Sequence, residues 1–397
     1  MPPETSQNFE ALSAQAQRLM SVFTRAGYEL VAPAIIQPAG IFLDVVGEEL
    51  RARTYVFTDP EGAELCLRPD LTVPTCRLHL ARHADGNVPA RYCYNGPAFR
   101  YQPGGGDSTH PREFRQAGIE SFAAADREAA DAEVAGLISE ALRDGGLETL
   151  RLRIGDLGLF TALIEALPMP RRWRRRLHHK FWRPEVFRAE LARLTSAAAL
   201  SAHGLPDALV AALDPDKPAD AARLVEAHMA AANVEMIGTR SLTEIAERLV
   251  IAAADARETP LAAATARLIE DYVKIRTDAA GATAAIRALT KGALASGKAG
   301  GLDAALDAYE RRLKLLDEAG VDLSGATFSA EFGRNLEYYT GFVFEFLSPK
   351  LDAKSPVAGG GRYDSLFADV GAPQPISAVG SSIHTERVLS ALGGGAA

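Results

Sequence analysis

Gly359-Gly-Gly-Arg-Tyr-Asp364 places an arginine, a tyrosine and an aspartate directly after three glycines, at the end of a predicted strand. Three further segments set polar side chains into apolar, strand-like sequence: Leu67–Pro74, Phe99-Arg100 with Arg115–Glu120, and Arg334–Glu345. Half-buried strands normally alternate apolar and polar residues. Gln116 and Glu120 are four residues apart, so both side chains point to the same face of their strand. The four segments therefore predict a sheet that carries a polar site.

The chemistry of these side chains suits a small zwitterionic ligand, alone or beside a phosphate-bearing partner. Asp70 and Glu120 can together hold a cationic amino group, and a nearby glutamine or tyrosine can hydrogen-bond a ring nitrogen or a carboxylate. Arg100 and Arg334 offer planar guanidinium groups that fit carboxylate or phosphate. The alternative is that these charges are surface residues or mutual ion pairs, and it is weaker for four segments together than for any one of them.

Strand-like sequence flanks a long helical middle. An amphipathic helix is predicted over residues 8–26, and a β-hairpin over strands 91–99 and 113–122 with a glycine-rich loop at 103–111. The other predicted elements are a helix at 124–144, strands at 149–154, 326–332, 337–347, 356–362 and 376–381, and a closing helix at 382–392. Residues 158–320 are helical in pattern. The predicted fold class is α+β, with a core of residues 1–160 and 325–397 and an all-helical insertion at 161–324.

Composition and charge argue against several classes of protein. Charged residues make up 24% of the chain and the net charge is −8, which is typical of a globular protein and lacks the basic excess of most nucleic-acid binders. No apolar stretch approaches the roughly 18 residues of a membrane span, and the N-terminus does not resemble a signal peptide. Cys66, Cys76 and Cys93 lack metal-ligand spacing and are interpreted as free thiols. We therefore expect a cytoplasmic protein without a metal site.

In order and relative position, the four segments resemble the catalytic domain of class II histidyl-tRNA synthetases. The resemblance covers about 1–160 and 325–392, including a stretch from Gly27 to Asp59 that follows the first motif of that family. It implies an antiparallel class II sheet flanked by helices, with a pocket for L-histidine. Arg100 and Arg334 match the arginines that contact ATP phosphate and the histidine carboxylate. The residues implied to bind histidine are Asp70, Thr72, Arg100, Gln116, Glu120, Arg334, Tyr338, Tyr339 and Tyr363.

Departures from the synthetase pattern fall mostly on the ATP and tRNA sides. Gln102 stands where the second class II motif has a glutamate, and an amide accepts hydrogen bonds differently from a carboxylate. His384 stands where the synthetases have a glycine that lets ATP approach the backbone. Arg387, on the ATP side, is kept. The sequence reaches Ala397 shortly after the closing helix, so we expect no anticodon-binding domain.

This combination resembles the regulatory subunits of ATP phosphoribosyltransferase, which are synthetase paralogues in bacterial histidine biosynthesis. The resemblance implies a non-catalytic subunit without a cofactor that activates a short-form catalytic subunit. It also implies that L-histidine is the regulatory ligand for feedback inhibition of the first step of the pathway. Gln102, His384 and Arg387 would then be remnants of a nucleotide site. The implied assembly is a homodimer within a hetero-oligomer, expected to be a hetero-octamer.

Two alternatives stay open. Arg100, Arg334 and Arg387 would also suit a histidine-activating enzyme, such as a truncated histidyl-tRNA synthetase-like ligase. The basic stretch RRWRRRLHHKFWR at 171–183 would suit a stand-alone RNA-binding module. The favoured interpretation of that stretch is a solvated helix face with Trp173 and Trp182 packed inward, ahead of a contact with an acidic subunit. We therefore expect no nucleic-acid partner and no membrane association.

Overall fold

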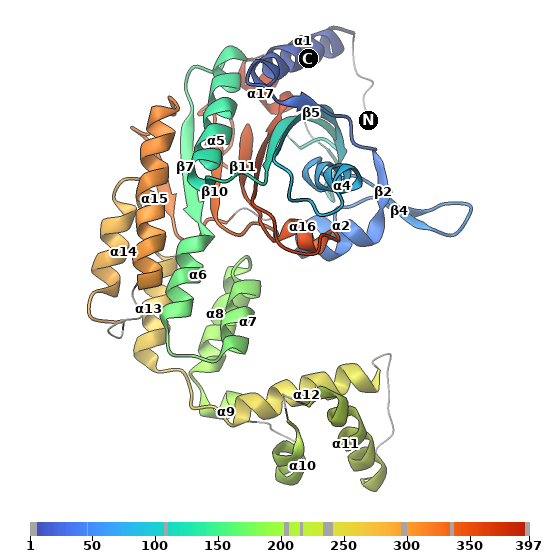
Figure 1. Cartoon of the computed structure of the whole chain (residues 1–397), viewed down its shortest axis with the longest axis vertical. Coiled ribbons are helices and arrows are strands. Elements are labelled where there is room, and N and C mark those ends of the chain that lie inside the picture. Colours follow the sequence, from blue (N-terminus) through green and yellow to red (C-terminus); the bar gives the residue numbers. More distant parts are fainter. Residues whose placement is uncertain are drawn as a thin grey trace. The chain divides into compact units, whose positions relative to one another are not determined.

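The computed structural model describes residues 6–45, 47–106, 110–201, 206–214, 217–232, 241–294, 300–333 and 337–393. The chain forms two compact units. The first unit comprises Met1–Pro168 together with Asp271–Ala397, and the second comprises Met169–Glu270. Both β-sheets belong to the first unit (Figure 1).

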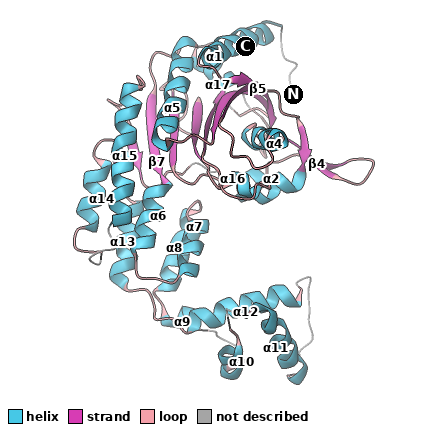
Figure 2. Ribbon diagram, in the orientation of Figure 1, coloured by secondary structure: helices cyan, strands magenta, loops and turns pink. Residues whose placement is uncertain are grey.

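A nine-stranded sheet forms the centre of the first unit (Figure 2). Neighbouring strands pair antiparallel, except β1 with β5 and β7 with β9, which are parallel. The α+β class and the hairpin of β5 and β6 are as predicted. In spatial order the strands are β1 (Glu29–Leu30), β5 (Ala90–Phe99), β6 (Glu113–Phe122), β12 (Ala378–His384), β11 (Ala358–Arg362), β10 (Phe342–Leu347), β7 (Arg151–Asp156), β9 (Thr327–Ser329) and β8 (Arg276–Asp278).

One strand starts later than predicted. The expected strand at 337–347 is shortened to β10, which begins at Phe342. Tyr338 and Tyr339 are adjacent and both buried, so they break the alternation that places successive side chains on opposite faces of a strand. Tyr338 ends a turn and Tyr339 lies in the irregular segment that leads into β10.

Helices cover both faces of this sheet. On one face lie α1 (Ser6–Arg25), α5 (Arg127–Asp144) and α17 (Thr385–Ala391), with α1 packed on both α5 and β5 (Figure 1). The carboxylate of Asp126 caps α5 by accepting from the Ala129 N–H at 3.1 Å. On the other side, α4 (Thr72–Arg82) lies within the curve of the sheet. Near α4 lie α2 (Ala39–Val45), α3 (Gly47–Arg51), α16 (Leu366–Asp369) and a small sheet of β2 (Ile36–Pro38), β4 (Glu64–Leu67) and β3 (Val56–Thr58).

A buried ion network joins a distant helix to this core. Asp131 of α5 accepts through one carboxylate oxygen from Arg362 of β11, at 2.7 Å from Nη2. Its other oxygen accepts from Arg312 Nε at 2.8 Å. Arg312 lies on α15 (Gly300–Glu318) and also donates to Asp156 at 2.8 Å. All four side chains are buried, so each charge depends on the others for compensation.

This network explains why the helical middle differs from the predicted insertion at 161–324. Only Met169–Glu270 separates as a compact unit, because α15 is held to the core by Arg312. The stretch is also not wholly helical, since β8 adds a strand at the sheet edge beside β9. The first unit therefore also contains α6 (Leu157–Ala166), α14 (Ala282–Thr290) and α15.

The second unit consists of helices and contains the whole basic stretch at 171–183. Its helices are α7 (Arg171–Lys180), α8 (Pro184–Leu194), α9 (Ala197–Leu200), α10 (Asp207–Ala212), α11 (Pro218–Ala231) and α12 (Leu242–Ala256), and α13 (Ala263–Val273) begins within it. Trp173 is buried as predicted and donates to Asp255 at 2.7 Å, whereas Trp182 is only half-buried. Arg172 and Arg176 also pair with Asp255. These cations are neutralised within the unit, which weakens the interpretation of this stretch as an RNA-binding surface.

Among the described residues, no helix combines the length and the apolarity that crossing a membrane requires.

Replacing Arg312 by methionine should strongly destabilise the chain. The Arg312→Met variant leaves Asp131 and Asp156 buried without this cation, and breaking a buried ion pair from one side costs about 3–5 kcal/mol. Urea unfolding followed by circular dichroism measures the change. The neighbouring Arg311→Met variant is the control, because Arg311 pairs with Asp126 and Glu128 at the exposed surface. Equal unfolding midpoints for the two variants would contradict a structural role for the buried network.

Candidate functional site

The floor of the candidate site is formed by β6 and β12. Their antiparallel register places Gln116 opposite His384 and Glu120 opposite Gly380. Gly380 makes room for the acid, since a Cβ atom there would collide with Glu120 Oε2. Gly118, between the two polar residues of β6, is equally constrained because a Cβ atom would lie 2.7 Å from the Tyr94 ring. The glycines of β6 and β12 therefore leave the space that the Glu120 carboxylate and the Tyr94 ring occupy.

Glu120 is the most deeply buried acid of the floor, with 0% of its surface exposed. Its Oε1 accepts from the Tyr94 hydroxyl at 2.9 Å, and its Oε2 accepts from the Tyr363 hydroxyl. The Thr72 hydroxyl also hydrogen-bonds it. Burial raises the pKa of Glu120 to about 7, although the three hydroxyls favour the charged form. The carboxyl group therefore titrates near neutral pH.

Asp70 and Gln116 each have a buried oxygen that is ready to accept a hydrogen bond. Asp70 precedes α4, and its Oδ1 accepts from the Val73 N–H at 3.3 Å. The Gln116 amide donates to Ser382 Oγ at 3.3 Å. Asp70 Oδ2 and Gln116 Oε1 have no hydrogen-bond partner among the residues that the structure describes. Buried polar atoms are nearly always paired, so these two oxygens are available to accept from a ligand.

Aromatic side chains line the pocket beside Glu120. The Tyr338 ring lies 4.9 Å from that of Tyr339 and 5.7 Å from that of Tyr363, measured between centroids. All three tyrosines are buried. The structure thus brings together Asp70, Thr72, Gln116, Glu120 and the three predicted tyrosines, while Arg334 lies outside the described residues.

On the predicted nucleotide side, the side chains already contact other residues of the chain. The His384 ring stacks on Phe114, with centroids 4.9 Å apart and planes at 24°. Arg100 lies 5.0 Å from the same Phe114 centroid and donates to the Pro69 carbonyl at 2.9 Å. Gln102 accepts from Arg53 at 2.6 Å, and Arg387 donates to the Pro356 carbonyl at 2.9 Å.

Sequence reasoning missed Tyr94 as a site residue. It lies on β5, directly opposite Gly118 of β6, and this glycine lets its ring cross the strand toward Glu120. A glycine between Gln116 and Glu120 was a usable signal, because it predicts that a bulky side chain crosses the strand there.

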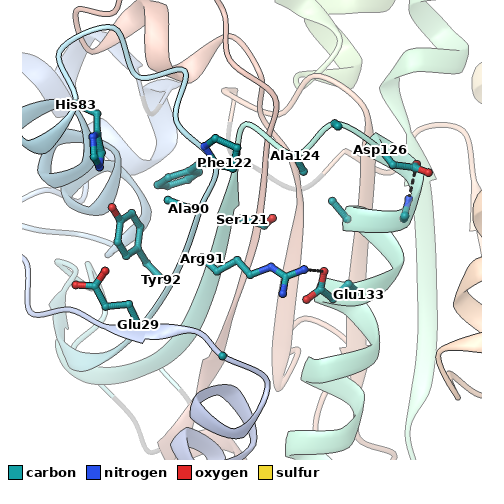
Figure 3. A pocket seen from close by; sticks show the side chains of 15 residues that line it. Glu29, His83, Ala90, Arg91, Tyr92, Ser121, Phe122, Ala124, Asp126 and Glu133 are labelled. Atoms are coloured by element: carbon teal, nitrogen blue, oxygen red, sulfur yellow. Dashed lines mark hydrogen bonds and ion pairs between the residues drawn. The ribbon is translucent and has the colours of Figure 1, made fainter.

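A separate cavity of about 650 Å³ opens where β5 begins and β6 ends (Figure 3). Tyr92 and Phe122 form part of its wall, and Arg91 reaches across to Glu133 at 2.9 Å. None of the predicted histidine-binding residues that the structure describes lines it. Its acidic side chains are already paired with arginines, as Glu29 with Arg82, Glu133 with Arg91 and Asp126 with Arg311. It therefore matches a zwitterion less well than the pocket around Glu120.

Comparison with known sequences identifies the family. The chain matches the histidyl-tRNA synthetase family over residues 3–250 and 221–388. An ATP phosphoribosyltransferase regulatory subunit from Brucella anthropi is 36% identical over 366 residues, which cover 92% of this chain and 93% of that protein. The chain belongs to the family of ATP phosphoribosyltransferase regulatory subunits. The regulatory subunit from Brucella ovis is also 36% identical, over 370 residues that cover 92% of this chain and 93% of that protein.

Solved structures share the fold. An ATP phosphoribosyltransferase regulatory subunit/histidyl-tRNA synthetase from Bacillus halodurans matches with a TM-score of 0.68 and 20% identity, over 99% of this chain and 82% of that one. A histidine–tRNA ligase subunit from Alicyclobacillus acidocaldarius matches with a TM-score of 0.58 and 23% identity, over 99% and 96% of the two chains. The predicted class II histidyl-tRNA synthetase-like fold is confirmed.

The glycine at position 380 should be irreplaceable in the pocket floor. In Gly380→Ala, the new methyl group meets the Glu120 carboxylate, so we expect a loss of about 1–3 kcal/mol from overpacking. Differential scanning calorimetry measures the change. Gly40→Ala is the matched control, because a Cβ atom at Gly40 of α2 meets nothing within 4 Å. A Gly380→Ala variant as stable as the control would mean that the Glu120 carboxylate moves aside freely.

Proposed function

We propose that this chain is a non-catalytic subunit that binds L-histidine between α4 and the floor formed by β6 and β12. In this role it activates a short-form ATP phosphoribosyltransferase catalytic subunit and transmits feedback inhibition by histidine. The observation that carries the proposal is the pair of unpartnered buried acceptors, Asp70 Oδ2 and Gln116 Oε1, in the same pocket as Glu120. Family membership supports the role as a regulatory subunit.

The charges in the pocket favour one orientation of histidine. Burial raises the pKa of Asp70, while the positive charge of Arg100 lowers it, so the two side chains are electrostatic neighbours. An ammonium group beside Asp70 and a carboxylate beside Arg100 would satisfy both ends of a zwitterionic backbone. The imidazole then extends toward Glu120, where Tyr363 and Tyr338 provide aromatic walls.

The nucleotide side supports a regulatory function rather than histidine activation. Aromatic side chains commonly bind a purine by stacking on it, and the His384 ring already stacks on one face of Phe114. His384 itself is only 8% exposed. Opening this side for ATP would therefore require displacing a packed imidazole. The retained Arg100 and Arg387 favour the second candidate, a histidine-activating ligase, and they make a direct assay of activation necessary.

Exposed apolar side chains around the small sheet support a homodimer. Ile36 of β2 and both Val56 and Phe57 of β3 are 52%, 44% and 38% exposed. Leu30 of β1 is 63% exposed. Large apolar side chains left exposed in this way can mark interaction sites on protein surfaces. We propose that a second copy of the chain covers them, within a hetero-oligomer that also contains the catalytic subunit.

Removing the Gln116 acceptor should abolish the response to histidine. In Gln116→Ala, the loss of one buried hydrogen bond and of the amide's packing should weaken histidine binding at least about tenfold, while activation of the catalytic subunit persists. Titration calorimetry and the histidine inhibition of the reconstituted enzyme measure the two effects. Gln102→Ala is the control, because Gln102 lies on the nucleotide side and should leave histidine affinity unchanged.

The unaltered protein should fail to exchange pyrophosphate into ATP when histidine is present. Histidine binding without exchange supports the regulatory subunit, and robust exchange would instead support the ligase. Histidine inhibition that survives Gln116→Ala would place the regulatory pocket elsewhere.

A charge on the small sheet should separate the proposed dimer. Phe57→Asp places a carboxylate in the proposed apolar contact, so we expect half the mass of the unaltered protein by light scattering. Val88→Asp is the control, since Val88 is also 38% exposed but lies outside the small sheet. If Phe57→Asp stays dimeric and Val88→Asp does not, the proposed interface is on the wrong surface.

A further inference from the structure

Glu120 is a buried carboxyl group without an ion-pair partner among the described residues. The groups that face it are hydroxyls, a thiol and a second acid. The positive charges of Arg68 and Arg100 instead lower the pKa of Asp70 and so favour its charged form. Tyr94 faces Glu120 from β5, Thr72 and Cys76 from α4, Asp70 from the segment before α4, Tyr363 from the end of β11, and Gly380 from β12.

A histidine zwitterion does not correct this imbalance. Its ammonium and carboxylate groups cancel each other, and Arg68 and Arg100 already act on Asp70, so the filled pocket would still give the Glu120 carboxylate no cation of its own among the described residues. An uncompensated charge in such a site is costly. One proton between Glu120 and the imidazole removes that cost, either as a carboxylic acid beside a neutral ring or as a carboxylate beside an imidazolium.

We propose that the pocket binds histidine together with one proton, which the Glu120 carboxyl group and the imidazole share. This inference rests on the proposed function, since it concerns the same pocket and ligand. The proton is conserved in the step: it comes from Glu120 when the empty pocket is protonated, and from solvent when it is not. Histidine sensing is then also pH sensing.

The direction of the pH effect follows from the proton count. In the empty pocket the pKa of Glu120 is about 7, and sharing the proton with imidazole raises it in the complex. The complex therefore holds more protons than the free components above pH 7, so affinity is lost as the pH rises. Between about pH 7 and pH 8.5 the dissociation constant should increase about tenfold. Below about pH 6.5 free histidine is itself protonated, and affinity declines again because only one proton fits.

Titration calorimetry of the full chain with L-histidine tests the proposal. Measured at about pH 8 in two buffers of different ionisation enthalpy, the unaltered protein should take up close to one proton per histidine bound. Glu120→Gln should remove the dependence of the dissociation constant on pH between about pH 7 and pH 8.5. Glu386→Gln is the matched control: Glu386 is a half-buried glutamate whose pKa is also raised by burial, and it accepts from the Arg115 N–H at 2.8 Å. The Glu386→Gln variant should keep the roughly tenfold change of the dissociation constant between about pH 7 and pH 8.5.

Affinity that is constant or higher at pH 8.5, with no proton uptake, would overturn the proposal. That result would mean that a charged Glu120 accepts from a neutral imidazole N–H. Should Glu120→Gln fail to fold, the proton count on the unaltered protein still decides. Absence of histidine binding at every pH would instead reject the proposed function, so the two failures are distinguishable.

Discussion

The carboxylate of Asp131 is the constraint on which the first unit depends. It is fully buried on α5 and is shared by Arg362 of β11 and Arg312 of α15. Buried charges of this kind are costly when unpaired, so the three elements hold one another in a single arrangement. Because successive residues of a strand face opposite sides, fixing Arg362 on the helix-covered face turns the next residue, Tyr363, toward Glu120. The geometry of the pocket is thus set from behind the sheet.

Local patterns in the sequence predicted the parts of the pocket that belong to one strand. Gln116 and Glu120 share a face of β6 because of their spacing, and the structure places them there. Contacts between distant segments were not accessible in this way. Arg312 and Asp131 are 181 residues apart, and no periodicity connects them. The helical pattern of 161–324 therefore suggested one insertion, while the charges divide that stretch between the two units.

Short strands, and side chains that reach across a neighbouring strand, could not be predicted for a related reason. β8 has three residues, too few to show an alternation, and its assignment depends on pairing with β9. Tyr94 lies 26 residues before Glu120, and its hydroxyl reaches the acid only because Gly118 has no side chain. The role of Arg334 stays a prediction, since it lies outside the described residues.

The two halves of the site differ in how fully their polar groups are satisfied. On the amino-acid side, Asp70 and Gln116 retain buried acceptors that a ligand can use. On the nucleotide side, His384 and Gln102 already make contacts within the chain. A ligand gains little from groups that must first give up existing partners. At both positions where the sequence departs from the synthetase pattern, the side chain therefore already has a partner within the chain.

The glycines of the pocket floor have a consequence for the motion of the sheet. Gly118, Gly380 and Gly361 lie on three neighbouring strands and pack against backbone or side chains that leave no room for a Cβ atom. Glycine within a strand costs about 0.5–1 kcal/mol relative to alanine, because the unfolded chain loses more freedom there. The close packing around Glu120 and Tyr94 is therefore obtained where the sheet has its weakest intrinsic preference to form. Amide hydrogens along β11 and β12 should exchange with solvent sooner than those of ordinary central strands, and an occupied pocket should slow them.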